Sequence, residues 1–265
     1  RELGAGQSGG RPAAWGEGGV SEARVVAGAD DRVRKSPGLA PAAVAGVINA
    51  AQARGSACGN ELSLFAQALA DLKEERGYAP QVIGITGTNG KTTTTRLTAH
   101  IARSAGYKVG YTTSDGVYIQ NQMMMKGDCT GPVSSTFVLR DPTVDFAVLE
   151  CARGGILKNG LAFQNCDIAI ITNVSTDHIG LGGIDSLEQM AKVKAVVAET
   201  VFTHGYAILN ADDDLVYRIK DDLQCNIGLF SMDENNPRIK KHCKNGGLAT
   251  VYENGYVSIM KGTWK

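Results

Sequence analysis

The chain has no excess of charge of either sign and no long apolar run. Its 265 residues carry 27 Lys and Arg side chains against 27 Asp and Glu, so the formal net charge is zero. Such a balance argues against a nucleic-acid-binding surface spread over the whole chain, while a local anion site stays compatible with it. No stretch approaches the roughly 18 uninterrupted apolar residues of a membrane helix, and the N-terminus has no basic segment followed by an apolar one. We therefore expect no membrane insertion and no secretion.

Metal-binding cysteine patterns are also missing. The sequence contains no Cys-x-x-Cys pair, and no histidine stands at metal-site spacing from a cysteine. Six cysteines are present: Cys58, Cys129, Cys151, Cys166, Cys225 and Cys243. Their spacing is typical of reduced thiols in a cytoplasmic protein.

Glycine, by contrast, is abundant and unevenly distributed. The 33 glycines amount to about 12% of the residues, against an average of about 7%. Twelve of them fall in residues 1–60, and seven of those fall in the first 20 positions without a preceding strand. We expect residues 1–80 to form an incomplete N-terminal segment, with helices at Ala42–Arg54 and Glu61–Glu75. Residues 81–265 are expected to form the main domain.

From residue 81 onward, short apolar runs alternate with helical patterns or loops. This alternation predicts a three-layer α/β domain in which helices cover the faces of a mostly parallel sheet. Two helices are predicted at about 91–105 and about 187–202, the second with Ser186 and Gln189 as a capping box. Near the C-terminus, Asn254-Gly255 predicts a hairpin between two further strands. The predicted strands are Val82–Thr86, Phe146–Glu150, Ile168–Val174, Tyr206–Asn210, Ile227–Phe230, Leu248–Tyr252 and Tyr256–Met260.

The strongest motif lies in residues 82–95, where an apolar strand runs through a Gly-x-x-Gly-Lys-Thr turn into a helix. Backbone N–H groups and the positive end of the helix converge at such a turn, which suits a triphosphate. Gly87 and Gly90 let the backbone approach the anion, and Lys91 is placed to contact the β- and γ-phosphates. The Thr92 hydroxyl is placed to ligate Mg²⁺.

This loop, Thr86-Gly-Thr-Asn-Gly-Lys-Thr92, resembles the phosphate loop of the Mur ligase superfamily. That superfamily includes the peptidoglycan amino-acid ligases and folylpolyglutamate synthase, which phosphorylate a carboxylate with ATP and let an amine attack the acyl phosphate. The resemblance implies ATP and Mg²⁺ as cofactors and a central ligase domain over residues 81–265. It implies nucleotide contacts from the loop and the start of the helix: Gly87, Thr88, Asn89, Gly90, Lys91, Thr92 and Thr93.

Polar side chains follow two other predicted strands. Glu150 ends one strand and His178 follows another, so both should project at the carboxyl edge of the sheet, where the phosphate loop opens. Glu150 is similar to the superfamily's glutamate that ligates Mg²⁺. The resemblance implies a metal site formed by Thr92, Glu150 and His178, with His178 serving a second Mg²⁺.

Two short motifs at strand ends point to the nucleotide. Thr172-Asn173-x3-Asp177-His178 resembles the superfamily's Thr-Asn-x3-Asp-His signature, which implies that Asn173 binds the cofactor. Asn210-Ala-Asp-Asp213 is similar to the superfamily element near the nucleotide base. The same four residues are also an ordinary start of a helix.

The second predicted helix carries two candidates for the carbamylated lysine that members of the superfamily often contain. On a helical wheel that starts at Leu187, Lys194 falls inside the apolar stripe and Lys192 faces solvent. A lysine in a buried stripe is costly unless it is paired, snorkels to water or is modified. We expect Lys194 to be carbamylated and to act in catalysis with Lys91 and His178. A snorkelling lysine is the alternative.

Residues from about 99 onward are most similar to the cyanophycin synthetase branch of the superfamily. The similarity is carried by Gly110–Tyr118, Gly127–Pro132, Leu149–Leu157 and Gly247–Tyr256. It implies a ligase that adds arginine to an aspartate side-chain carboxylate. Asp128, Thr130 and Arg153 would lie near the carboxylate-bearing substrate, and Arg153 could equally be a structural salt-bridge partner.

Residues 1–98 are more similar to the D-glutamate-adding peptidoglycan ligases, through Leu3–Gly9, Lys35–Ala40 and Gly59–Ala66. The first of these segments has no leading strand, which weakens the case for UDP binding. The two resemblances meet within residues 84–98, as expected of a chimera or an assembly artefact. The chain also stops before the superfamily's C-terminal amino-acid-binding domain, so complete ligation is not expected.

The sequence therefore indicates a cytoplasmic fragment of an ATP-dependent amide-bond ligase. Its expected partners are ATP and a carboxylate-bearing peptide or amino acid, with no nucleic acid and no membrane. One alternative is the D-glutamate-adding ligase, which only the N-terminal residues support. A second alternative is an ATP-binding module without complete ligase activity. The sequence leaves the oligomeric state open.

Overall fold

The computed structural model describes residues 33–35, 58–60, 79–176, 180 and 183–262. Contacts between Cα atoms divide the chain into two compact units, Arg1–Asp71 and Leu72–Lys265. The described residues of the first unit form a parallel pair of short strands, β1 (Val33–Lys35) and β2 (Cys58–Asn60). The helices predicted before residue 80 and the glycine-rich loop at residues 3–9 lie outside the described residues.

The second unit is built on a ten-stranded sheet. Its strands are β3 (Gln81–Thr86), β4 (Val109–Thr113), β5 (Gly116–Ile119), β6 (Gln122–Lys126), β7 (Phe146–Glu150), β8 (Cys166–Ile171), β9 (Val201–Asn210), β10 (Asn226–Ser231), β11 (Leu248–Glu253) and β12 (Tyr256–Lys261). They lie in the order β12-β11-β10-β9-β8-β3-β7-β4-β5-β6. All neighbours from β11 to β4 are parallel, and β12, β5 and β6 join the two edges as antiparallel strands. The predicted α/β class with a mostly parallel sheet is confirmed.

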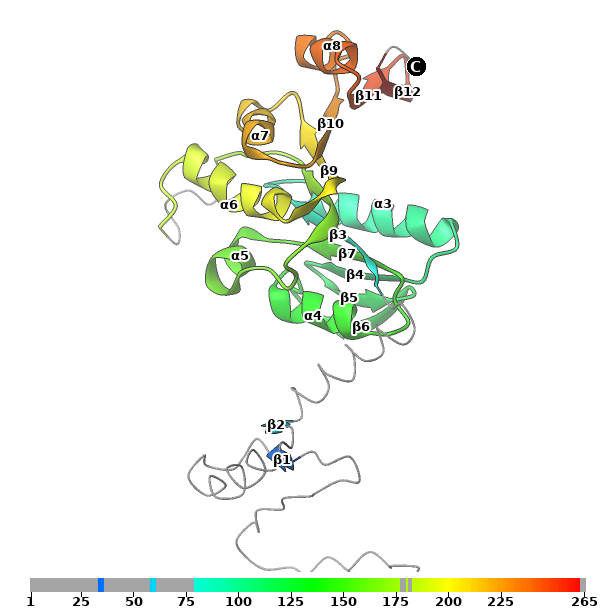
Figure 1. Cartoon of the computed structure of the whole chain (residues 1–265), viewed down its shortest axis with the longest axis vertical. Coiled ribbons are helices and arrows are strands. Elements are labelled where there is room, and N and C mark those ends of the chain that lie inside the picture. The colour runs from blue at the N-terminus through cyan, green and yellow to red at the C-terminus, as the bar shows by residue number, and fades with distance from the viewer. Residues whose placement is uncertain (1–32, 36–57, 61–78, 177–179, 181–182, 263–265) are drawn as a thin grey trace, which may run out of the picture. The chain divides into compact units, whose positions relative to one another are not determined.

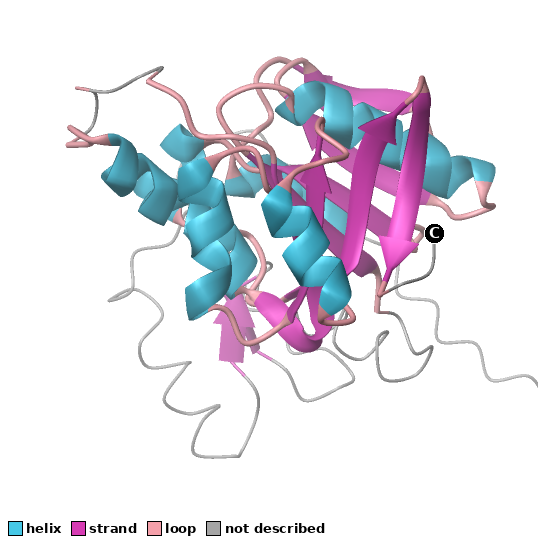
Figure 2. Cartoon of the chain, turned by 90° about the horizontal axis from the view of Figure 1, so that it is seen from above, coloured by secondary structure: helices cyan, strands magenta, loops and turns pink. Residues whose placement is uncertain are grey.

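Helices cover both faces of this sheet. The described helices are α3 (Lys91–Ser104), α4 (Pro132–Arg140), α5 (Arg153–Asn159), α6 (Leu187–Glu199), α7 (Asp214–Ile219) and α8 (Pro237–Lys244), with a 3-10 turn η1 (Lys220–Asp222). Helix α3 lies on one side of the sheet, and α4, α5, α6 and α7 lie on the other (Figure 1). Seen from above, the strands stand between these two sets of helices (Figure 2).

Alternating side chains of β3 contribute to a core on each face. Ile83 and Ile85 pack in one cluster with Ala99 of α3. Val82 belongs to the larger cluster on the other face, which includes Val197 of α6. Strands covered on both sides need apolar residues at every position. This requirement explains why the sequence shows continuous apolar runs rather than alternating ones.

Parallel pairing brings several polar residues to one edge of the sheet. In the register of the central strands, Ile85 of β3 stands beside Glu150 of β7 and Ile170 of β8. The segments that follow β3, β7, β8 and β9 therefore leave the sheet at the same edge, where ligands of open α/β sheets bind. The phosphate loop, Glu150 and Asn210 all belong to this edge.

Two local predictions from turn and cap residues are confirmed. The Ser186 side chain accepts a hydrogen bond from Gln189 N, and the Gln189 side chain accepts one from Ser186 N, which completes the capping box of α6. Asn254 and Gly255 both have positive φ, and the strands on either side of them pair antiparallel. No helix within the described ranges is long and apolar enough to cross a membrane.

Several predicted boundaries are wrong. Helix α6 ends at Glu199 rather than near 202, because Val201 already pairs with Cys166 of β8. Strand β8 ends at Ile171 rather than at Val174, because the residues that follow it leave the sheet to bind the phosphate loop. The strands β4, β5 and β6 were not predicted. All five residues of β6, which forms one edge of the sheet, are exposed, so that strand has no buried apolar run.

Candidate functional site

The phosphate loop joins β3 to α3 and leaves the N-terminus of that helix open. Gly90 is the N-cap residue of α3, with φ of 81°, and no side chain caps the helix. The first turn contains no acidic residue. The first N–H groups of a helix have no partners within the helix, and their dipoles favour an anion. The positive φ at Gly90 explains the glycine there, since residues with a Cβ rarely adopt that conformation.

A second loop, Thr172–Ser175, which follows β8, holds the phosphate loop by hydrogen bonds. The Asn173 side chain accepts from Asn89 N at 2.9 Å and donates to Asn89 O at 3.2 Å. Thr172 Oγ1 donates to the same carbonyl at 2.7 Å, and Thr88 N donates to Asn173 O at 2.9 Å. In this conformation the backbone N–H groups of Thr88 and Asn89 serve the contact between the two loops.

The close approach of these loops explains Gly87. A Cβ built on Gly87 would overlap the Thr172 hydroxyl and would lie 3.1 Å from Thr172 Cβ. Its φ of 148° is also unfavourable for residues with a side chain. The sequence assigned this glycine to the approach of an anion. The structure adds a second requirement, which is the packing of Thr172.

Three oxygen-bearing side chains meet beside the start of α3. Thr92 Oγ1 donates to Glu150 Oε2 at 2.9 Å and lies 3.1 Å from Ser114 Oγ. Glu150 is 2% exposed, at the end of β7. Carboxylate and hydroxyl oxygens are hard ligands of the kind that Mg²⁺ prefers. The predicted pair of Thr92 and Glu150 is therefore brought together, and Ser114 joins it.

The charge of Glu150 is poorly compensated by the described residues. Burial raises the pKa of its carboxyl group, and the Asp128 charge adds to that effect, while the Thr92 hydrogen bond and the Lys91 charge oppose it. A cation at this position would stabilise the carboxylate. Among the described residues, no three His, Cys, Asp or Glu side chains form a metal cluster. The other predicted ligand, His178, lies outside the described residues.

A cavity of about 160 Å³ beside the phosphate loop is lined by cationic side chains. Lys91, Arg153 and Lys194 line it together with Gly87 and Met190. Lys194 is 2% exposed, and its burial together with the nearby Lys91 and Arg153 charges lowers its pKa from 10.5 to about 8. The carboxylates of Asp128 and Glu150 do not line this cavity. An anion is therefore the ligand that its charge favours.

Lysine placement on α6 follows the helical wheel. Lys194 is buried and Lys192 is exposed, as the apolar stripe predicts. Lys192 lines a different groove, together with Glu188 and Asp222. Whether Lys194 is modified stays a prediction.

The three predicted substrate residues occupy the segments around the ends of β6 and β7. Asp128 Oδ1 accepts hydrogen bonds from Thr130 N at 3.2 Å and Thr130 Oγ1 at 2.7 Å. Thr130 O accepts from Ala152 N at 3.2 Å, immediately before Arg153 begins α5. Thr130 is 8% exposed, so its side chain mainly orders this segment around Asp128. Arg153 lies at the cationic cavity.

Asn210 contacts the loop after β8. Its Nδ2 donates to Thr172 O at 2.9 Å, and its Oδ1 accepts from Asp212 N at 2.9 Å. The side chain is thereby fixed beside the loop that holds Asn89. Contact of Asn210 and Asn173 with a nucleotide stays a prediction.

Two residues of the site were missed as functional residues, although both lie in motifs noted above. Ser114 follows β4, and Asp115 holds its turn by accepting from Thr113 Oγ1 at 2.6 Å and Tyr118 Oη at 2.7 Å. Asp213 accepts from Val174 N at 2.7 Å and caps α7. The signal that could have found both is their position just after strands that end at the ligand-binding edge.

Comparisons with known proteins agree with this geometry. The family model of the Mur ligase middle domain matches residues 85–259. The cyanophycin synthetase of Geminocystis herdmanii is 58% identical over 183 residues, which are 69% of this chain and 21% of that protein. The UDP-N-acetylmuramoylalanine--D-glutamate ligase of Paraburkholderia phymatum is 33% identical over 229 residues, which are 85% of this chain and 40% of that protein. The chain thus spans about a fifth of the length of the cyanophycin synthetase that it matches.

Solved structures share the fold at low sequence identity. A UDP-N-acetylmuramoyl-L-alanyl-D-glutamate--2,6-diaminopimelate ligase is 23% identical with a TM-score of 0.54, over 72% of this chain and 39% of that chain. MurF from Acinetobacter baumannii is 18% identical with a TM-score of 0.51, over 78% of this chain and 43% of that chain. The residues matched by the Mur ligase middle domain lie in one compact unit, which also contains the phosphate loop and the polar residues at the strand ends. The chain therefore belongs to the Mur ligase family.

Proposed function

We propose that residues 81–265 bind ATP with Mg²⁺ and transfer its γ-phosphoryl group to a carboxylate, as the central domain of an ATP-dependent carboxylate–amine ligase. The observation that carries this proposal is the cationic cavity of Lys91, Arg153 and Lys194 beside an uncapped helix N-terminus. Phosphoryl transfer depends mainly on positioning and on neutralising the charge of the transferring group. These residues offer both.

The chemistry divides into two steps. A carboxylate oxygen attacks the γ-phosphorus, and the bond to the β–γ bridging oxygen breaks to give an acyl phosphate and ADP. An amine then attacks the acyl carbon, phosphate leaves, and the nitrogen loses a proton. Lys91 would stabilise the transferring phosphoryl group, and Arg153 would orient the carboxylate through a charge-assisted hydrogen bond.

The metal would be held beside the start of α3. Thr92 and Glu150, with Ser114 next to them, supply the oxygen ligands, and the cation would neutralise phosphate charge when bound. His178 at a second cation, and Asn173 and Asn210 beside the nucleotide, complete the proposed site.

A cytoplasmic location accompanies this proposal. Five cysteines of the second unit, Cys129, Cys151, Cys166, Cys225 and Cys243, are free thiols. Free thiols are typical of proteins kept in a reducing compartment. ATP, the proposed cofactor, is also drawn from that compartment.

Lys194 is the proposed site of carbamylation. With a pKa lowered to about 8, a fraction of its amine is neutral near neutral pH. The neutral amine can add CO₂ and release a proton, which gives an anionic carbamate. Such an anion would be stabilised between Lys91 and Arg153, which otherwise repel the ammonium form. Carbon-13 NMR with labelled bicarbonate should detect a carbamate in the wild-type chain and none in Lys194→Ala.

The proposed substrate is an aspartate side-chain carboxylate, with arginine as the amine, in line with the resemblance to cyanophycin synthetases. The competing candidate is D-glutamate addition to a UDP-linked muramoyl peptide. It is favoured by one observation, because the match to the D-glutamate ligase covers 85% of the chain and so extends into residues 1–80. Because the chain spans a fraction of either relative, both activities would be tested after a C-terminal ligase domain is joined to it.

Calorimetry with ATP and Mg²⁺ tests the core of the proposal on the chain as it exists. Lys91→Ala should weaken ATP binding by about tenfold or more, because one charge-assisted contact to phosphate is lost. The matched control is Lys192→Ala, which removes the same charge from an exposed position on α6. Equal affinity of the wild type and Lys91→Ala would overturn the assignment. After a C-terminal ligase domain is joined to the chain, two carboxylates would be offered as substrates, the aspartate side chain and the UDP-linked muramoyl peptide. Tight ATP binding without phosphoryl transfer to either of them would favour a binding module.

A further inference from the structure

The turn that follows β9 is attached to the phosphate loop through an intermediate loop. Asp213 Oδ2 accepts a hydrogen bond from Val174 N at 2.7 Å, and Asn210 Nδ2 donates to Thr172 O at 2.9 Å. Both contacts hold the segment Thr172–Ser175 that follows β8. Residues from the end of β9 therefore fix a loop that belongs to a neighbouring strand.

That segment continues the connection to the phosphate loop. Asn173 bonds both the N–H and the C=O of Asn89, and Ser175 N donates to Thr88 Oγ1 at 3.0 Å. Val174, the residue held by Asp213, lies between these two contacts in the chain. A shift of the Val174 backbone would therefore displace both partners of the phosphate loop.

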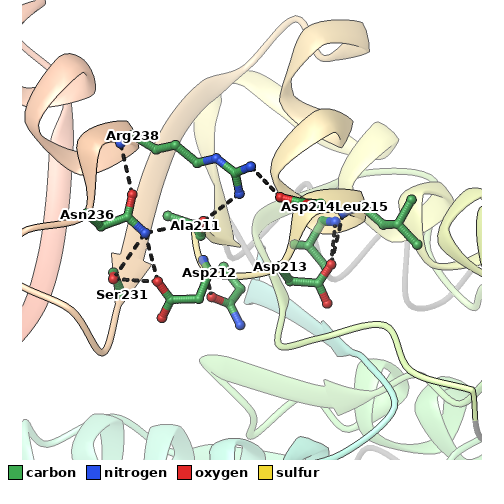
Figure 3. Close-up of polar contacts among 10 residues, drawn as sticks. Ala211, Asp212, Asp213, Asp214, Leu215, Ser231, Asn236 and Arg238 are labelled. Atoms are coloured by element: carbon green, nitrogen blue, oxygen red, sulfur yellow. Dashed lines mark hydrogen bonds and ion pairs between the residues drawn. The ribbon is translucent and has the colours of Figure 1, made fainter.

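The turn that carries Asp213 is itself held by further hydrogen bonds. Its neighbour Asp212 points to the opposite side of the turn (Figure 3), where it accepts from Ser231 Oγ at 2.6 Å and from Asn236 Nδ2 at 2.8 Å. Asn236 is 8% exposed, so this contact is largely shielded from water. Arg238 NH1 also donates to Ala211 O at 2.8 Å. The turn is thus anchored to β10 and α8 before Asp213 reaches Val174.

The Asp213 carboxylate makes two kinds of contact with its two oxygens. Oδ1 caps α7 by accepting from Leu215 N at 3.0 Å and Val216 N at 3.1 Å, while Oδ2 accepts from Val174 N. An ionised carboxylate accepts at both oxygens, whereas an asparagine amide has one accepting oxygen and one donating nitrogen. Asparagine would preserve the helix cap, for which it is a good residue, and would face Val174 N–H with a second donor.

We propose that Asp213 is a positioning residue for the triphosphate, which holds Val174 and thereby keeps the phosphate loop against the segment Thr172–Ser175, beside the open N-terminus of α3. The proposal rests on the proposed function, because it requires that the phosphate loop bind ATP. It assigns Asp213 to a contact through the protein rather than to a direct contact with the nucleotide. It predicts that the effect of losing Asp213 depends on the phosphates of the ligand and not on its base.

The test compares Asp213→Asn with Asp214→Asn in the full chain. Both variants remove one negative charge from adjacent positions, but the Asp214 carboxylate is exposed and pairs with Arg238. Calorimetry would measure the affinity for two probes with Mg²⁺ present, ATP and inorganic tripolyphosphate. Hydrogen exchange would follow the Thr88 and Asn89 amides, which donate hydrogen bonds to Asn173, the neighbour of Val174.

We expect Asp213→Asn to weaken the binding of ATP and of tripolyphosphate by a similar factor of about ten, comparable to the loss of one charge-assisted hydrogen bond. Exchange at Thr88 and Asn89 should become faster, and Asp214→Asn should leave both measurements unchanged. Weaker ATP binding with unchanged tripolyphosphate binding would overturn the proposal in favour of a base contact. If Asp213→Asn lowers the melting temperature but leaves both affinities and the amide exchange unchanged, Asp213 acts only as the cap of α7 and the proposal is overturned. Failure of the wild type to bind ATP would instead overturn the proposed function. Unchanged exchange in Asp213→Asn would by itself refute the positioning role of the contact between Asp213 and Val174.

Discussion

Replacement of Lys194 by methionine tests the energetic cost of a lysine buried among cations. Lys194 is 2% exposed, and its pKa falls from 10.5 in the unfolded chain to about 8 in the folded one. Because the folded pKa is the lower one, the penalty is fully present below pH 8 and disappears as the pH rises toward 10.5. The difference of the two pKa values corresponds to about 3 kcal/mol of unfolding free energy.

Lys194→Met should therefore be more stable than the wild type near neutral pH, by up to about 3 kcal/mol, because methionine keeps an unbranched apolar chain without the charge. The excess stability should shrink steadily as the pH is raised, since only the wild type gains stability from deprotonation. Urea unfolding at a series of pH values, in buffers freed of CO₂, measures both quantities. Lys192→Met, on the exposed side of α6, serves as the control and should leave the pH dependence of the wild type unchanged.

The reasoning would be refuted if Lys194→Met were no more stable than the wild type at neutral pH and showed the same pH dependence. Addition of bicarbonate gives a second reading. If the amine is carbamylated, bicarbonate should stabilise the wild type and leave Lys194→Met unaffected, because the carbamate replaces a repelled cation by an anion next to Lys91 and Arg153.

Two further perturbations act on the phosphate loop and on the metal ligands. Gly87→Ala should lower the free energy of unfolding by about 2 kcal/mol or more, because the new methyl group overlaps the Thr172 hydroxyl at an unfavourable φ. Urea unfolding measures this loss, and Gly90→Ala, which has open space around the new Cβ, is the control that carries φ strain without overlap. Equal losses of stability in the two variants would contradict the overlap. Thr92→Val should weaken the Mg²⁺-dependent part of ATP binding by about tenfold, since Glu150 loses its hydroxyl donor and the cation loses a ligand. Titration of Mg²⁺ at a fixed ATP concentration measures this effect. An unchanged Mg²⁺ dependence would exclude Thr92 from the metal site. Burial raises the pKa of Glu150, so its carboxyl group is protonated at a higher pH than that of an exposed glutamate. When the pH is lowered, the same titration in the wild type should therefore show Mg²⁺ affinity beginning to fall at a higher pH than an exposed glutamate ligand would give.

Much of the central domain could be predicted from local patterns. The apolar runs of β3 and β7 are continuous because these strands are covered on both faces, so their positions follow from composition alone. The edge strand β6 could not be found in this way, because all of its residues are exposed and it pairs at the rim of the sheet with β5. The predicted end of a helix was wrong where the backbone pairs with a strand distant in sequence, as Val201 does with Cys166.

The sequence by itself determined the phosphate loop, the burial of Lys194 and the strand ends at Glu150 and Asn210, because each of these follows from residue type and from spacing along one element. Only the tertiary structure decided which further residues meet them. The contact of Ser114 with Thr92 joins the turn after β4 to α3, and the contact of Asp213 with Val174 joins the turn after β9 to the loop after β8. Such contacts depend on the order of strands in the sheet, which places β8 between β3 and β9 although 79 residues of chain (87–165) separate β3 from β8. Hydrogen bonds between loops from different strands have no period along the chain, so no pattern in the sequence could reveal them.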